Sequence, residues 1–300
     1  MLSSGIAGYN SYENKIHANV ETSNQINNLY SEKEITLKDP PVSEVLSDKL
    51  VVKIKNKPLS PDLILTISNN KNESQISYLS DNDYDFLNPE KRKFVKTVLP
   101  IIINENQNIL LTRQFLLKLK KKLKNFKTLK ANELHNIEKI AEKYNIKFAK
   151  KHKLDLIEEI LLNVDIIPNS IALAQAAIES GWGKSRFAKE YNALFGEYTY
   201  DQNKGVVPLK REDGDTHLIK SFASYDNSVS SYFRNLNSHN AYKEFREVRN
   251  IMRIKNNFTN IDLLINKLNS YAEDNNYINN LNTVIENNNF EVFDTKVIYY

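Results

Sequence analysis

From Phe94 onward, apolar residues recur at the spacing of helix turns, and no other feature constrains the fold of this 300-residue chain as strongly. The pattern breaks once, between Leu194 and Phe222, where three glycines and a proline separate short β-type pieces. Helical spacing returns after this interruption. These observations predict an α+β fold that is predominantly helical and carries one small β-hairpin in its middle.

Each expected element follows from its local pattern. The helical stretches are residues 94–119, 132–144, 154–162, 227–235, 241–253, 261–271 and 277–285. A further helix is expected after Pro168, with Asn169 or Ser170 as its N-cap, and runs to about Ser180. The β-type pieces are residues 197–200, 206–209 and 216–222. Pro100 lies inside the first helical stretch, where we expect it to kink the helix or to lie near a helix start.

The first 85 or so residues have a different character. Their polar, aperiodic segments and scattered prolines predict a leader that is mostly disordered or loosely ordered. Met1–Val20 lacks the basic start and the apolar run of about 7–15 residues that a secretory signal needs. The expected organisation is a leader (1–85), a helical lead-in (86–165), the main domain (166–290) and a tail (291–300).

The composition excludes several kinds of site. Lysine and arginine number 41 against 37 acidic residues, and a net charge of +4 is too small for a strongly basic nucleic-acid-binding protein. The absence of cysteine excludes disulfides, thiol nucleophiles and Cys-based zinc sites. His217 and His239 are isolated and lack metal-site spacing, so we expect no metal and no cofactor. No apolar run reaches about 18 residues, so no membrane span is expected.

Lys118–Lys124 is a basic run at the end of the first helical stretch. Its simplest interpretation is a solvated helix face. The alternative is a site that attracts an anionic polymer. The pattern by itself favours the solvated face.

The stretch Ser170–Ser185 carries the most chemical information. It is apolar, rich in small residues, and holds one carboxylate, Glu179, at the end of the expected helix. A carboxylate in such surroundings loses water contacts, and this loss raises its pKa. A carboxyl group that keeps its proton near neutral pH can act as a general acid. The alternative is a solvent-exposed glutamate at a helix end. Trp182, the one tryptophan, offers beside it a flat apolar surface of the kind that stacks on sugar rings.

The segment IALAQAAIESGWGKSRFAKEYNALFGEYTY (Ile171–Tyr200) resembles the signature of the bacterial glucosaminidase domain, glycoside hydrolase family 73, in its Bax-type branch. Gly205–Arg249 and Tyr271–Leu281 resemble later parts of this mannosyl-glycoprotein endo-beta-N-acetylglucosaminidase-like domain. Phe94–Leu117 resembles the helix that precedes it in the branch. The segments stand in the family's order and together cover about residues 90–290.

The resemblance implies a lysozyme-like architecture, in which a helical lobe and a β-hairpin lobe border a cleft. It implies hydrolysis of the β-1,4 bond after N-acetylglucosamine in peptidoglycan, with Glu179 in the general-acid position. For the other half of the reaction, family members are thought to use a hairpin carboxylate or the substrate's acetamido group. Glu212 and Asp213 lie nearest the expected place, and the resemblance does not choose between them. Asp215 is a further hairpin carboxylate, and Glu197 is another that could reach the cleft. For each of these four acids the alternative is a solvent-exposed loop residue without a catalytic role.

Tyr271 and Tyr277 match a tyrosine-containing segment that lines the cleft of the family, Tyr271 more closely. Their phenols are expected to hydrogen-bond the acetamido group of the substrate or the acid itself, and the alternative is core packing. Glu197 and Tyr198 complete the expected substrate-binding set with Trp182. Phe195 is expected in the core.

Three functions stay open at this point. The first is a monomeric peptidoglycan hydrolase of the bacterial cell envelope, periplasmic or extracellular, whose partner is the glycan strand. The second is a non-catalytic glycan-binding or scaffolding module on the same fold. The third is a regulator of envelope enzymes that acts through the leader. Clearance of cell-wall material by the purified protein separates the first from the other two.

Overall fold

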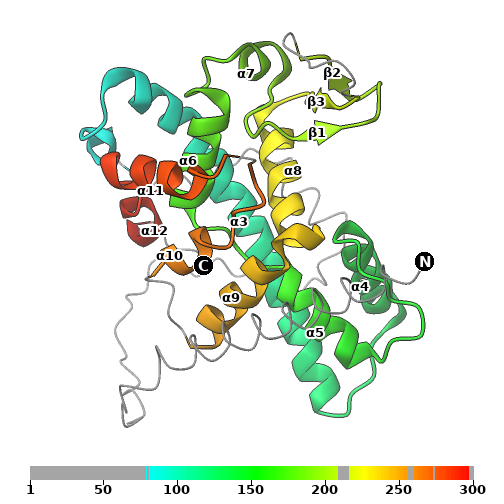
Figure 1. Ribbon diagram of the computed structural model, residues 1–300. Helices are drawn as coiled ribbons and strands as arrows, with labels where there is room; N and C mark the ends of the chain where they lie inside the picture. Colours follow the sequence, from blue (N-terminus) through cyan, green and yellow to red (C-terminus); the bar gives the residue numbers. More distant parts are fainter. Residues whose placement is uncertain (1–78, 80, 209–215, 256–259, 273, 297–300) are drawn as a thin grey trace, which may run out of the picture. The chain divides into compact units, whose positions relative to one another are not determined.

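The computed structural model describes residue 79 and residues 81–208, 216–255, 260–272 and 274–296 (Figure 1). The chain divides into two units, and the described residues all lie in the second, Lys57–Tyr300. The helices are η2 (Asp81–Tyr84), α3 (Pro89–Lys124), α4 (Ala131–Lys143), α5 (Lys153–Asn163), α6 (Asn169–Ser180), α7 (Arg186–Tyr191), α8 (Tyr225–Ser238), η3 (Asn240–Tyr242), α9 (Lys243–Ile254), α10 (Asp262–Ile265), α11 (Tyr277–Asn287) and α12 (Val292–Lys296). The strands are β1 (Tyr198–Thr199), β2 (Gly205–Val206) and β3 (Leu218–Lys220). Nearly all of the predicted leader lies outside the described residues.

The prediction of a predominantly helical α+β fold is confirmed. Helices α4, α5, α6, α8, α9 and α11 begin and end within three residues of the stretches that the periodicity indicated. The prediction for residues 261–271 was wrong in length, because only the short α10 forms there. Two short helices, α7 and α12, were not predicted, and α12 lies in the stretch assigned to the tail.

Helix α3 is the longest element, with 36 residues. Its first turn is capped by the Asn88 side chain, which accepts a hydrogen bond from the Lys91 amide at 3.0 Å, and Pro89 stands at the first helical position. Pro100 lies in the interior of the helix, so the option that it marks a helix start was wrong. Helix α3 packs against α5, α6 and α8 and runs beside them in Figure 1. The predicted lead-in therefore shares one hydrophobic core with the main domain.

Helix α6 is buried on nearly every side. Ten of its twelve residues are buried, and the exceptions are Ile178 and Glu179. Its alanines let α3, α11 and α12 pack closely around it. Pro168 provides no side-chain cap, and Asp294 of α12 takes over by accepting a hydrogen bond from the Ser170 amide at 3.0 Å.

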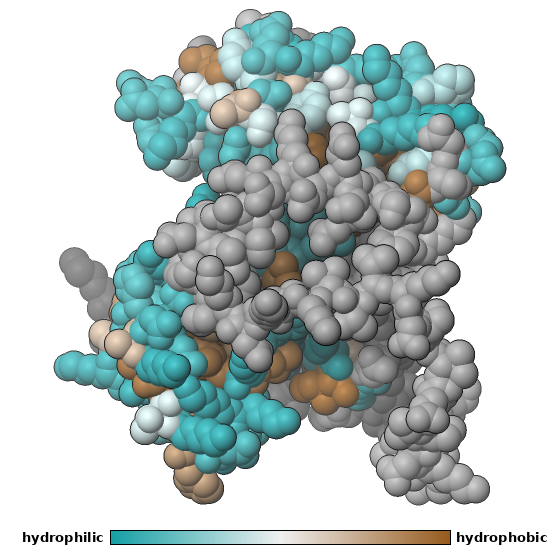
Figure 2. All heavy atoms as spheres, turned by 180° about the vertical axis from the view of Figure 1, so that it is seen from behind, coloured by the Kyte–Doolittle hydropathy of each residue, from teal (hydrophilic) through white to brown (hydrophobic). Residues whose placement is uncertain are grey.

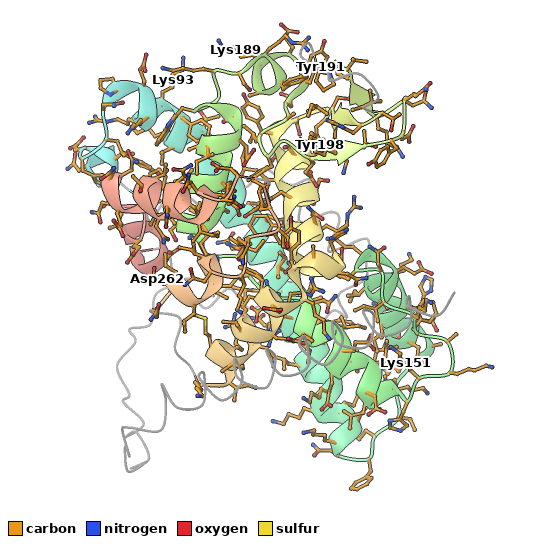
Figure 3. The ribbon with its side chains drawn as sticks, viewed as in Figure 1. Lys93, Lys151, Lys189, Tyr191, Tyr198 and Asp262 are labelled. Atoms are coloured by element: carbon orange, nitrogen blue, oxygen red, sulfur yellow. The ribbon has the colours of Figure 1, made fainter. Side chains whose placement is uncertain are left out.

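The three strands form one antiparallel sheet in the order β1-β3-β2. The consecutive strands β2 and β3 pair as the predicted hairpin requires, and β1 adds a third strand on the other edge of β3. A Cβ atom at Gly205 would lie 2.5 Å from the Cβ of Leu218 and 2.6 Å from Cγ2 of Thr199. This close approach accounts for glycine at the start of β2. In Figure 3 the sheet lies beside α7 and carries the labelled Tyr198.

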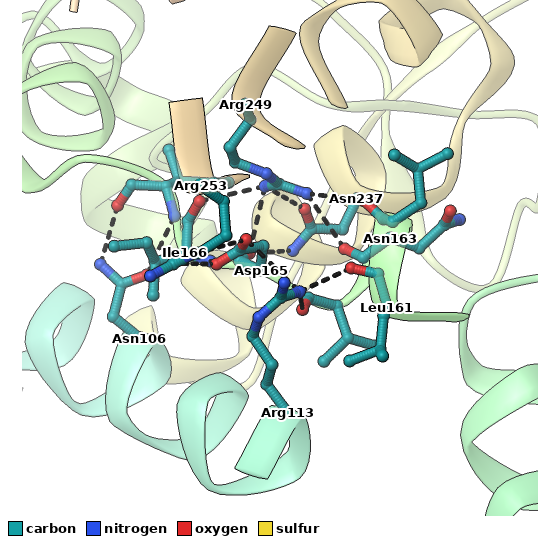
Figure 4. A network of polar contacts seen from close by, with 12 residues as sticks. Asn106, Arg113, Leu161, Asn163, Asp165, Ile166, Asn237, Arg249 and Arg253 are labelled. Carbon is teal, nitrogen blue, oxygen red and sulfur yellow. Dashed lines mark hydrogen bonds and ion pairs between the residues drawn. The ribbon is translucent and has the colours of Figure 1, made fainter. Parts of the chain in front are cut away.

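A buried polar network joins the α5–α6 connection to α3, α8 and α9 (Figure 4). Two arginines donate to carbonyl oxygens of this connection: Arg249 to those of Leu162, Asn163, Asp165 and Ile166, and Arg113 to those of Leu161 and Val164. The Asp165 carboxylate pairs with Arg113 at 3.4 Å and with Arg253. These contacts satisfy terminal carbonyl groups of α5 that have no partner within the helix.

None of the described helices combines the length and the apolar character that crossing a membrane requires. The longest described helix, α3, carries clusters of charged residues near both ends, with Glu105 and Arg113 between them. From behind, the described surface is mostly hydrophilic, with small scattered apolar patches (Figure 2).

Candidate active site

Glu179 lies in the last turn of α6, and the loop between α7 and β1 passes directly over its carboxylate. A Cβ atom at Gly196 would stand only 3.1 Å from Oε2 of Glu179. Gly196 also has a φ of +62°, in the left-handed region that favours glycine. Glycine therefore meets two demands here: it permits the backbone turn and it leaves room for the carboxylate.

Burial governs the electrostatics of this carboxylate. Loss of water contacts raises the pKa of Glu179 to about 7, and a hydrogen bond with the Tyr277 hydroxyl acts weakly in the opposite direction. No cation is among the groups that shift this pKa. Glu179 therefore exchanges its proton near neutral pH, as the apolar character of its helix predicts.

A chain of hydrogen bonds leads from the core to Glu179. The buried Tyr232 hydroxyl donates to Oε1 of Gln175 at 2.6 Å. Nε2 of Gln175 donates to the Tyr277 hydroxyl oxygen at 2.8 Å. Because this oxygen accepts from the amide, its own proton is directed to the Glu179 carboxylate. The chain fixes the amide orientation of Gln175 and makes Tyr277 a donor to the ionised form of Glu179.

Sequence reasoning placed Tyr277 near the acid but did not include Gln175 or Tyr232 in the site. A signal for Gln175 existed, because it precedes Glu179 by four residues and so shares its helix face. Tyr232 stands on α8, 57 residues from Gln175 in the chain, and no local pattern connects the two.

Tyr271 supports the site from the side of the loop. Its hydroxyl donates to the carbonyl oxygen of Phe195 at 3.0 Å, next to Gly196. Its ring stacks on that of Tyr277, with 5.6 Å between centroids and an interplanar angle of 15°. Phe195 itself is buried and stacks on Tyr232 at 3.9 Å, as expected for a core residue. Tyr271 thus positions both the loop over Glu179 and the phenol beside it.

Glu197, the residue after Gly196, is a second buried carboxyl group. Its Oε1 accepts a hydrogen bond from Oγ of Ser231 at 3.3 Å, and Lys220 donates to the same hydroxyl at 2.5 Å. Its Oε2 is buried and has no hydrogen-bond partner among the described residues. Burial raises the pKa of Glu197, and Lys220 and Ser231 counteract this rise. Burial raises the pKa values of Tyr232, Tyr242 and Tyr271, and the charges of Glu179 and Glu197 add to this rise, so both carboxyl groups act on the same aromatic cluster.

The Trp182 ring contacts aromatic and cationic side chains of the protein itself. Its ring lies edge-on to Phe94 at 5.7 Å and to Phe290 at 6.0 Å. The ammonium group of Lys91 stands over the ring, 4.7 Å from its centroid. These contacts give the half-buried Trp182 packing partners on α3 and in the segment after α11, and the stacking on sugar that its sequence position suggested stays a prediction.

The remaining sequence candidates divide into exposed and undescribed residues. Tyr198 is 62% exposed on β1, and its ring lies 4.3 Å from that of His217, which therefore belongs to the sheet structure as expected. His239 accepts a hydrogen bond from the Ala241 amide at the start of η3. Glu212, Asp213 and Asp215 lie outside the described residues. Within the described ranges, no group of three or more His, Cys, Asp or Glu residues could hold a metal ion.

Comparisons with known proteins bear on this geometry. The family model of mannosyl-glycoprotein endo-beta-N-acetylglucosaminidase matches residues 154–290. The chain is 31% identical over 204 residues to Protein bax of Escherichia coli (strain K12), covering 67% of this chain and 71% of that protein. A solved structure, the catalytic domain of the autolysin Auto from Listeria monocytogenes, covers 76% of this chain at 16% identity and a TM-score of 0.39. Because this TM-score is low, family membership rests on the two sequence matches and not on the structural match.

Proposed function

This chain belongs to the glucosaminidase family, and from that premise we propose that it cleaves the β-1,4 bond after N-acetylglucosamine in peptidoglycan, with Glu179 as general acid. Membership makes the protein a glycoside hydrolase that acts on glycan. The observation that carries the assignment of the acid is the position of the half-buried Glu179 beneath Gly196, without a cationic partner and with a pKa of about 7.

The geometry suits proton donation to a departing sugar. At neutral pH a substantial fraction of Glu179 holds a proton, which passes to the glycosidic oxygen as the bond from that oxygen to the anomeric carbon breaks. The carboxylate that remains is stabilised by the hydrogen bond from Tyr277. Since Gln175 and Tyr232 hold this phenol in place, the donor needs little reorganisation during the reaction.

The other half of the reaction needs a second group to stabilise or trap the sugar cation. Glu212, Asp213 and the acetamido group of the substrate are the proposed candidates. We expect Ala variants of Glu212 and Asp213 to lose only part of the activity. This result would assign the second role to the acetamido group of the substrate. A single variant as inactive as Glu179→Gln, with an unchanged melting temperature, would instead identify a direct catalytic carboxylate.

Glu197 is proposed to bind substrate. Its buried Oε2 lacks a partner among the described residues, and an unsatisfied buried oxygen is costly unless a ligand group supplies a hydrogen bond. An amide or hydroxyl of the glycan has the required chemistry. Tyr198, exposed on the neighbouring strand β1, is proposed to provide aromatic surface to the same glycan.

Muropeptide analysis of digested sacculi tests the proposal. Wild-type protein should release fragments with N-acetylglucosamine at the reducing end, and Glu179→Gln should release none while still binding sacculi. Glu286→Gln, the same change on an exposed turn of α11, is the matched control. Wild-type protein that binds sacculi but releases no fragment would establish the non-catalytic glycan-binding module instead.

A cell-envelope location fits a family that acts on peptidoglycan. We propose that this monomeric protein works in the periplasm or outside the cell. Fractionation of the producing bacterium, with sedimentation of the purified protein, tests both statements.

A further inference from the structure

The charge of this chain is unevenly distributed. Residues 118–153 contain thirteen lysines and three glutamates, so this segment alone carries +10 in a chain whose net charge is +4. The segment comprises the end of α3, all of α4 and the first residue of α5. It stops where the match to the glucosaminidase family begins, at residue 154. The hydrolase chemistry therefore gives no reason for this charge.

Most of these lysines face solvent. Three are matched by acids: Lys120 by Glu158 at 2.9 Å, Lys122 by Glu133 at 2.7 Å, and Lys151 by Glu159. The other ten are exposed: Lys118, Lys121, Lys124, Lys127, Lys130, Lys139, Lys143, Lys147, Lys150 and Lys153. In Figure 3 the labelled Lys151 marks this basic end, and the labelled Lys93 and Lys189 stand at the opposite end, near α7.

An aromatic side chain protrudes from the basic end. Phe126 follows α3 and is 99% exposed. It adopts a φ of +56°, and the amides of Phe126 and Lys127 donate to the carbonyl oxygens of Leu123 and Lys122. This is a helix-ending motif whose left-handed position usually holds glycine. A bulky residue there is strained and, with its ring in water, contributes no packing. Folding therefore does not explain a phenylalanine at this position.

The exposed face of α3 adds to the same surface. Leu117 is 45% exposed and lies one and two turns from Lys121 and Lys124, on the same side of the helix. The surface therefore combines lysines with two apolar side chains, Phe126 and Leu117, that are exposed to solvent. Lysines near an anionic lipid surface are attracted to its headgroups, and exposed aromatic and aliphatic side chains enter the boundary with the acyl chains.

We propose that this basic end, residues 118–153, docks reversibly on an anionic phospholipid surface, with its lysines at the headgroups and Phe126 inserted at the interface. A soluble anionic polymer would account for the lysines but would leave the strained, fully exposed ring without a role. Each lysine close to an anionic membrane contributes about fivefold in affinity, so a few of the ten exposed ones suffice for reversible binding. The attraction weakens with salt, because exposed charges are screened beyond about 10 Å at 0.1 M.

Vesicle co-sedimentation of the full-length protein tests this docking. Wild-type protein should bind phosphatidylcholine vesicles that contain about one third phosphatidylglycerol, should not bind pure phosphatidylcholine, and should dissociate at high salt. Lys121→Glu with Lys124→Glu should weaken binding about tenfold or more. Lys93→Glu with Lys189→Glu changes the charge equally at the opposite end and should leave binding within about twofold.

The ring is tested separately. Phe126→Gly relieves the backbone strain, so this variant should melt at the same or a higher temperature than wild type. Despite this unimpaired stability, it should bind anionic vesicles several-fold more weakly than wild type. Ile254→Ser, at a side chain that is 75% exposed on α9, is the matched apolar control and should bind as wild type. Equal binding to neutral vesicles, or unchanged binding by the Lys121/Lys124 or Phe126 variants, would overturn the proposal. Binding to heparin or polyphosphate without binding to anionic vesicles would overturn it as well and assign the surface to a soluble polymer.

Discussion

Two acidic side chains in the described part of this protein are surrounded by very different groups. Asp165, between α5 and α6, is enclosed by Arg113, Arg249 and Arg253. These guanidinium groups hold its pKa below the usual value despite its burial. Glu179, ten residues after the start of α6, has apolar neighbours, a phenol and a glycine backbone around it. Burial raises its pKa to about 7.

The difference shows how one chain uses buried carboxyl groups for two purposes. A carboxylate with cationic partners stays ionised at every physiological pH and joins helices together. A carboxyl group without such partners exchanges its proton near neutral pH, which is useful for acid catalysis and costly for stability. Replacing each carboxyl group by its amide, Glu179→Gln and Asp165→Asn, should therefore separate the catalytic role from the structural role.

Glu179→Gln should have the largest effect on activity. The change is nearly isosteric and removes the transferable proton, so turnover should fall on the order of 10²–10⁴-fold. Turnover on a defined chitooligosaccharide measures this. Near wild-type turnover by a folded Glu179→Gln protein would show that another group is the acid.

Asp165→Asn should affect stability instead. It leaves three arginines around a site without negative charge, and breaking a buried ion pair in this way costs about 3–5 kcal/mol. Urea denaturation at pH 7 measures the loss, and turnover per folded molecule should stay close to wild type. A protein as stable as wild type would mean that the carbonyl contacts of Arg249 and Arg113 are sufficient without the carboxylate.

The two acids should also give opposite pH dependences of stability. The pKa of Glu179 is raised on folding from 4.5 to about 7, so its favourable contribution is complete below 4.5 and is lost as pH rises through about 7. The free energy of unfolding of Glu179→Gln, relative to that of wild type, should therefore rise by about 1–3 kcal/mol between pH 4.5 and 8. The pKa of Asp165 is lowered, so its contribution is lost as pH falls. Melting curves at several pH values test both, and a constant difference between wild type and Glu179→Gln would contradict the raised pKa.

Tyr277→Phe should give the smallest change. Its hydroxyl lowers the pKa of Glu179, so its removal should raise that pKa and move the alkaline limb of the pH–rate profile upward by less than about one unit. Tyr200→Phe, at an exposed tyrosine just after β1, is the matched control. An alkaline limb that moves downward would show that the phenol favours the protonated acid.

Local patterns predicted the parts of this fold that depend on short stretches. The apolar spacing located α4, α5, α6 and α11 within about two residues, because a helix bonds residues four apart and buries one side. The short α7 and α12 carry too few turns to show a period, and two-residue strands do not reveal which neighbour they pair with. The sheet therefore contains one strand, β1, beyond the predicted hairpin.

At the site, the sequence by itself determined that Glu179 would be a carboxyl group in apolar surroundings, because the alanines and isoleucines around it belong to its own helix. Only the tertiary structure decided what touches it. Gln175 meets Tyr277 across 102 residues of chain and Tyr232 across 57, and Gly196 reaches the carboxylate from a loop beyond α7. The half-buried Trp182, predicted as a binding surface, lies edge-on to Phe94 of α3 and to Phe290, which follows α11. Burial of a helix face is a local property, whereas a hydrogen-bond partner depends on where distant segments pack.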